Sequence, residues 1–151
     1  MRKNFDKLLI GLTGEYLVAG MMSLKGWVAS LTLKNYPSVD IFGLNPETNQ
    51  NINVQVKTLK NATNFPVGVM KSKREDIDQI INCSFVFVYI GKNDSIRYFI
   101  ISRKDLIDLI IKTDDEYFFK PREKELKDYP IGISLKQIAE YENKWENLWK
   151  E

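Results

Sequence analysis

The sequence predicts an α/β domain in which a mixed β-sheet is flanked by helices. Two apolar segments rich in β-branched and aromatic residues, 84–90 and 96–101, are joined by a polar turn and indicate paired central strands. A long apolar segment near the N-terminus indicates a largely buried helix. The 151 residues, 44% of them hydrophobic, predict one globular domain spanning residues 1–151.

The first third of the chain predicts a helix followed by three strands. Residues 5–24 form the helix, and Gly26 ends it. Residues 27–33 follow as a strand, and residues 35–38 as a turn. Strands at 39–44 and 52–57 are joined by a polar loop, which predicts a hairpin.

The remainder predicts helices around the two central strands. Residues 58–73 show no clear period and predict a loop, and residues 74–82 a short helix. Ser102 and Asp105 form a capping-box pattern for a helix that runs through Ile111. The segment 114–130 is charged and irregular, and Ser134 with Gln137 predicts the start of a final helix.

The composition excludes several kinds of catalysis. The chain has no histidine, so Ser-His-Asp and Cys-His nucleophiles and histidine zinc sites are excluded. Any metal must be held by oxygen atoms, which favours Mg²⁺. Cys83 is the single cysteine, so no internal disulfide forms. We also find no signal peptide and no apolar run approaching membrane-spanning length, and expect a cytoplasmic protein without a membrane partner.

The positive charges are unevenly distributed. The net charge is only +2, but residues 48–74 contain no Asp or Glu and carry five cations. Such a segment can bind phosphates. The alternative is a solvated lysine face.

Four polar residues carry the chemistry that the sequence suggests. Glu15 lies on an apolar stripe of the first helix, where a carboxylate is costly unless it is paired or binds metal. Asp40 lies in an apolar strand, and alternation places Gln55 and Lys57 on one face of the next strand. Taken singly, each has an ordinary explanation: a snorkelling or paired Glu, a turn-capping Asp, and a half-exposed strand.

Together these residues resemble the PD-(D/E)XK nuclease superfamily, which has a restriction-endonuclease-like fold. The pattern of that superfamily is an acid on the first helix, an Asp at the start of a strand, and (D/E)-X-K on the next strand. Gly14-Glu15, Pro37-Ser38-Val39-Asp40 and Gln55-Val56-Lys57 match it in order and spacing. The resemblance covers residues 5–60 closely, and the chain also resembles small bacterial members with a Val-Gln-Val-Lys-Thr strand.

The resemblance implies a metal-dependent DNA endonuclease that hydrolyses phosphodiester bonds. It implies that Asp40, Gln55 and Glu15 hold Mg²⁺ or Mn²⁺ and that Lys57 acts on the attacking water and the developing charge. Gln55 departs from the usual acid and offers a neutral carbonyl oxygen. Nucleic-acid-binding contacts to the DNA backbone would come from Lys60, Lys71, Lys73 and Arg74.

Two other functions remain open. One is a catalytically attenuated nucleic-acid-binding or interaction module on the same fold, and the other is an unrelated small α/β binding domain. Because cutting a duplex usually needs two sites, we expect a homodimer or higher homo-oligomer. Its interface would use the aromatic segment 117–119 or the last helix with Trp145 and Trp149, whose other expected role is core packing.

Overall fold

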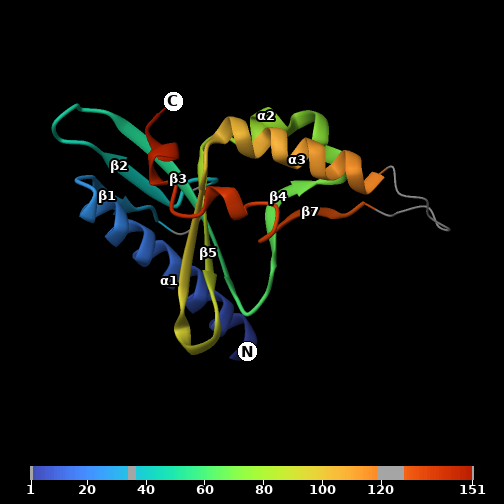
Figure 1. Ribbon diagram of the computed structural model, residues 1–151, viewed down its shortest axis with the longest axis horizontal. Helices are drawn as coiled ribbons and strands as arrows, with labels where there is room; N and C mark the ends of the chain where they lie inside the picture. Colours follow the sequence, from blue (N-terminus) through green and yellow to red (C-terminus); the bar gives the residue numbers. More distant parts are fainter. Residues whose placement is uncertain (1, 34–36, 119–127, 151) are drawn as a thin grey trace.

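A five-stranded mixed sheet is the centre of the computed structural model, which describes residues 2–33, 37–118 and 128–150 (Figure 1). The strand order is β1-β2-β3-β5-β6, and β3 and β5 are the parallel pair while the other neighbours are antiparallel. The strands are β1 Val28–Leu31, β2 Ile41–Leu44, β3 Asn51–Lys60, β5 Ser84–Ile90 and β6 Ile96–Ile101. The predicted α/β class, a mixed sheet flanked by helices, is confirmed.

Strand β3 changes its neighbours along its length. Its first part pairs with β2, ending at the Ile41–Val54 partners, and its second part pairs with β5 from the Val54–Ser84 partners onward. Beyond the start of β2, no described strand pairs with that edge of β3. The candidate site described below lies at this change of partner.

Helix α1, Arg2–Leu24, covers one face of the sheet. Val18 and Met22 are fully buried there against Val54, Val56 and Val86. Val54, Val56 and Val86 all point to this face because side chains alternate along a strand.

The helix approaches β3 very closely at Gly14. A Cβ on Gly14 would lie 1.8 Å from the Thr58 hydroxyl oxygen, so only a glycine fits at this position. Contrary to the sequence expectation, Asp6–Leu24 is long and apolar enough by length and composition to cross a membrane. Only 17% of this window is buried, so the expected largely buried helix is wrong: α1 buries one stripe and exposes Leu8, Leu9 and Leu24. One such helix is weak evidence for a membrane span, since core helices and signal sequences also meet the criterion.

The opposite face carries the second core. Phe85, Phe87 and Phe99 point to it and are buried beneath α3, Arg103–Phe118, and the short helix α2, Ile77–Ile80. A two-stranded sheet of β4, Asn64–Met70, and β7, Pro130–Ser134, completes the layer. Figure 1 shows α2 and α3 together at one end of the central sheet, with β4 and β7 beside them.

The structure corrects the expected loop at 58–73. Strand β3 continues to Lys60, and β4 follows, with Phe65, Val67 and Val69 alternating into the core. The expected short helix is divided into a 3-10 segment, η1 Lys71–Asp76, and α2.

The final helix is also a wrong prediction. Ser134 ends β7, and the chain continues through turns and two 3-10 segments, η3 Ala139–Tyr141 and η4 Trp145–Leu148. Gln137 Oε1 accepts hydrogen bonds from the Ser134 backbone N–H and hydroxyl, both at 2.8 Å. This is a local turn contact, and Asn143, with φ of 57°, prevents a continuous helix.

The two C-terminal tryptophans pack into the protein as expected for core residues. Trp145 is buried beside Tyr98, and Trp149 stacks on Trp27 with ring centroids 5.5 Å apart. The cap of Ser102 on α3 is present, since its hydroxyl accepts the Asp105 N–H at 3.1 Å. The helix then continues past Ile111 to Phe118. The side chains of the aromatic segment 117–119 lie outside the described residues.

Candidate active site

Asp40 and Gln55 are joined directly across the β2–β3 pair. Asp40 precedes β2, and its backbone N–H donates to the Val54 carbonyl at 2.9 Å. Its Oδ2 accepts a hydrogen bond from Gln55 Nε2 at 2.9 Å and another from the Val56 backbone N–H at 2.7 Å. The carboxylate therefore caps the edge of β3 at the point where β2 begins.

The three strand residues of the predicted site share one face of the sheet. Ile41 and Val54 are register partners and are buried on the α1 side. Alternation therefore places Asp40, Gln55 and Lys57 on the opposite face. All three are half-buried, so they remain accessible from solvent.

Lys57 is distinguished by its lack of a counter-charge. Its ammonium lies 6.0 Å from the centre of the Phe85 ring, and within the described part of the chain no carboxylate pairs with it. A cation without an acidic partner, on the same face as a carboxylate, can receive an anionic ligand.

Cys83 lies beneath this cluster. Its thiol donates to the Ser38 carbonyl oxygen at 3.4 Å. Burial raises the pKa of Cys83 to about 11, with a lowering influence from the Gln55 backbone and a raising influence from the charge of Asp40. The thiol is therefore protonated at neutral pH, as expected for a packing residue rather than a nucleophile.

Glu15 lies on the helix that covers the other face of the sheet. It follows Gly14, whose contact with Thr58 places this part of α1 beside β3, and its side chain is half-buried. The nearby edge of β3 has no described strand partner. The structure thus brings Asp40, Gln55 and Lys57 onto one face and Glu15 onto the helix behind them.

The four cations expected to contact DNA all have acidic partners. Lys60 pairs with Asp94 at 2.9 Å, and Lys73 lies 3.8 Å from Asp76 in a pair that is half exposed or more at both ends. Such exposed pairs contribute little and can exchange for other anions.

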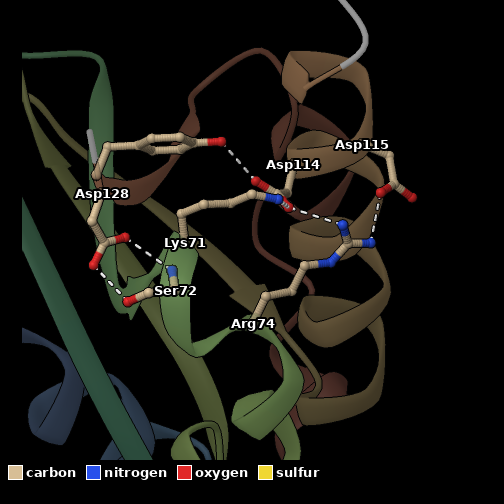
Figure 2. A network of polar contacts seen from close by, with 7 residues as sticks. Lys71, Ser72, Arg74, Asp114, Asp115 and Asp128 are labelled. Atoms are coloured by element: carbon tan, nitrogen blue, oxygen red, sulfur yellow. Dashed lines mark hydrogen bonds and ion pairs between the residues drawn. The ribbon is translucent and has the colours of Figure 1, made fainter. Parts of the chain in front are cut away.

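Lys71 and Arg74 have a different environment (Figure 2). Both contact the fully buried Oδ2 of Asp114, Lys71 at 2.6 Å and Arg74 at 3.0 Å. Arg74 also pairs with Asp115 at 2.6 Å, while the Tyr129 hydroxyl donates to Asp114 Oδ1 at 2.8 Å. These contacts tie η1 to α3.

Asp114 was missed by the sequence analysis, although a signal exists. It continues the buried stripe of Leu106 and Ile110 at four-residue spacing along α3. Burial alone would raise the pKa of its carboxyl, but the hydrogen bonds and charges of Lys71, Tyr129 and Arg74 outweigh burial and lower it. The group is therefore a buried anion that holds two cations in place.

The donor set around Asp40 is sparse. No cluster of three or more Asp, Glu, Cys or His suited to a metal occurs among the residues that the structure describes. Asp40 Oδ1 and Gln55 Oε1 accept no hydrogen bond within that same part of the chain. A hard cation that keeps several waters, such as Mg²⁺, fits one carboxylate and one amide oxygen.

No protein-family profile and no curated protein matches the sequence. Among solved structures, the chain is similar to Archaeoglobus fulgidus Hjc, a Holliday junction resolvase from an archaeal hyperthermophile. The TM-score is 0.43 at 13% identity, over 85% of this chain and 87% of that one.

Proposed function

We propose that this chain is a metal-dependent DNA endonuclease of the PD-(D/E)XK superfamily. The observation that supports it is the cluster of Asp40, Gln55 and Lys57 on one face of the sheet. In that cluster the acid and the amide are hydrogen-bonded, and the lysine has no acidic partner within the described chain.

Each residue has a role that follows from its contacts. Asp40 would supply the anionic oxygen for Mg²⁺ or Mn²⁺, and the Gln55 carbonyl oxygen a neutral one. The bound cation would polarise the phosphate and acidify a water. Lys57 would orient the attacking water and stabilise the negative charge that develops on the phosphate. Glu15, from α1, would hold a water at the open edge of β3.

The proposed DNA contacts divide into two kinds. Lys60 and Lys73 can exchange their exposed carboxylate partners for phosphates. Lys71 and Arg74 remain paired with the buried Asp114 and thereby fix the position of η1. They contribute to DNA binding by positioning η1 and through the ammonium and guanidinium atoms that remain exposed.

Cutting both strands of a duplex usually needs two active sites, so we propose a homodimer or larger homo-oligomer in the cytoplasm. Trp145 is buried within the chain, so it is not available for the subunit interface that the sequence analysis considered. Light scattering at tens of micromolar tests the assembly, and a strict monomer would restrict the activity to nicking or to cutting single-stranded branches.

The experiment is cleavage of labelled duplex, junction, flap and single-stranded DNA with Mg²⁺ or Mn²⁺. Asp40→Asn keeps the side-chain shape and an acceptor for the Val56 N–H but removes the charge, and should abolish cutting. Lys57→Ala should leave DNA binding nearly intact and remove turnover, because its role is in the transition state. Lys112→Ala, an exposed lysine on α3, is the matched control and should cut normally.

A non-catalytic nucleic-acid-binding module is the second candidate. It is favoured by one observation, the neutral Gln55 side chain that already satisfies Asp40. If wild type and Gln55→Glu both bind DNA but cut none of these substrates with either metal, the module is the better description.

A further inference from the structure

A polar notch adjoins the candidate active site on the other edge of β3. It has a volume of about 210 Å³ and lies where β5 begins alongside the first half of β3. The lining residues are Gln50, Asn51, Ile52, Asn53, Asn82, Cys83, Ser84, Arg103 and Leu148. The notch is smaller than the ~300–1,000 Å³ of typical small-molecule pockets, and its lining contains no carboxylate. Its size and charge therefore suit one nucleobase with a phosphate.

The hydrogen-bonding groups that line the notch are largely unused. Ser84 is 7% exposed, yet its hydroxyl has no hydrogen-bond partner among the described residues. The side-chain amides of Asn51, Asn53 and Asn82 likewise make no hydrogen bond there. The Ser84 hydroxyl is still reached by solvent, because Thr58 Oγ1 is the buried side-chain oxygen without a partner among the described residues, so Ser84 can donate to or accept from a polar ligand in the notch.

Arg103 provides an oriented cation at the same place. Its Nε donates to the Ile81 carbonyl at 2.7 Å, and its Nη2 donates to the Asp78 carbonyl at 2.8 Å and contacts Asp78 Oδ1 at 3.2 Å. Nη1 has no partner within the described chain. A guanidinium fixed through two of its nitrogen atoms presents the third to a phosphate at little entropic cost.

The notch and the candidate active site are neighbours. Cys83 lines the notch, and its thiol donates at 3.4 Å to the carbonyl of Ser38, two residues before Asp40. Asn53 precedes Gln55 by two residues and so lies on the same face of β3. A strand with one phosphate at Lys57 would place its adjacent nucleotide over the notch.

We propose that the notch receives one unpaired nucleotide of the DNA strand beside the scissile phosphate. Arg103 binds the phosphate, and the amides of Asn53 and Asn82 bind the edge of the base, a pairing that favours adenine. Because a stacked, paired base cannot enter such a notch, the preferred substrate is DNA with single-stranded or extruded nucleotides. This inference rests on the proposed function and deepens it.

The test is binding in EDTA, where no cleavage occurs. The probes are a single-stranded DNA of about six nucleotides and the matching duplex, with nitrogen-15 NMR and fluorescence anisotropy as readouts. We expect the single strand to shift the backbone signals of Asn82, Ser84 and Arg103. Asn53→Ala combined with Asn82→Ala should weaken single-strand binding about tenfold and leave duplex binding unchanged.

Gln79→Ala, an exposed amide on α2 outside the notch, is the control and should bind as wild type. The proposal is overturned if the double variant binds the single strand as tightly as this control, or if the shifts avoid Asn82 and Ser84. Ser84→Ala provides a second variant that keeps the packing, and unchanged binding of adenine-containing single strands by it would also count against the notch. If the single strand binds in the notch but no metal supports cleavage, the proposed nuclease function is refuted while the proposal of a nucleotide-binding notch stands.

Discussion

Replacing Gln55 by Glu tests how the charge of the candidate site is balanced. Gln55 Nε2 donates to Asp40 Oδ2 at 2.9 Å, so the substitution removes a donor and places a carboxylate oxygen against another. Two full charges at this separation repel by about 6 kcal/mol at an effective dielectric constant near 20.

Protonation limits the cost. The new carboxyl can avoid the repulsion by holding a proton, which for an ordinary Glu pKa of ~4.3 costs about 4 kcal/mol at pH 7. Both side chains are half-buried and can turn apart, so we expect a loss of about 2–3 kcal/mol in the free energy of unfolding. A carboxyl whose pKa is raised by folding destabilises increasingly as pH rises, so the loss should fall to about 1 kcal/mol or less at pH 5.

Urea denaturation in EDTA at pH 5 and pH 7 measures the loss in free energy of unfolding. The same titrations with Mg²⁺ measure how much of that loss the metal restores. The metal neutralises both carboxylates, so Mg²⁺ should stabilise Gln55→Glu more than wild type and bind it more tightly. Gln79→Glu adds the same charge at an exposed site and is the control. A loss independent of both pH and Mg²⁺ would refute the assignment of a metal to Asp40 and Gln55.

Three further predictions concern residues around the site. Asp114→Asn should lower the free energy of unfolding by about 3 kcal/mol at pH 7 in urea denaturation, since it leaves two cations without their buried anion. Because folding lowers the pKa of Asp114, that difference should shrink as the pH falls below about 4. Cys83, with a pKa of about 11, should react with iodoacetamide at pH 8 only as fast as the protein opens, and rapid labelling would contradict its buried position. Gly14→Ala should destabilise the protein, because the added Cβ would lie 1.8 Å from the Thr58 hydroxyl oxygen. Gly20→Ala has nothing within 4 Å of the added Cβ and should raise the thermal midpoint. A stabilising Gly14→Ala would refute the close packing of α1 on β3.

Strongly patterned segments could be predicted from the sequence. Residues 84–90 and 96–101 are mostly apolar, with Ser84 and Arg97 as the polar exceptions, and a polar turn separates them; the structure has strands with these same bounds. The hairpin that joins Asp40 to Gln55 follows from alternation, which also fixes the shared face of Gln55 and Lys57.

Strands that contain turn-forming residues were missed. In β4, Pro66 and Gly68 occupy the exposed positions between buried apolar residues, and in β7 Gly132 pairs with Pro66. A proline is tolerated there because this small sheet is two-stranded and both strands have a free edge. The alternating burial was present in the sequence, but these residue types are more typical of loops.

Ion pairing could not be predicted from the sequence. Lys71 and Arg74 lie in an acid-free segment, so they resemble a free phosphate-binding surface. Their partner, Asp114, is 40 or more residues further along the chain and meets them only because α3 packs beside η1. Whether a lysine finds an acidic partner is decided by which distant segments pack beside it. Lys57 has no acidic partner in the described structure, and local composition alone does not distinguish it from Lys71 and Arg74.

The change of partner along β3 has a consequence for the order of folding. Asp40 and Gln55 are 15 residues apart and meet within one hairpin, whose closure costs little chain entropy. The surroundings of Lys57, by contrast, require β5 to dock in parallel after an intervening crossover that contains β4 and α2. Non-local parallel pairing is intrinsically slow. In pulse-labelled hydrogen exchange during refolding we expect the Val56 amide, held by Asp40, to be protected before the amides of β5, so that the ligand pair forms first and the lysine is enclosed last.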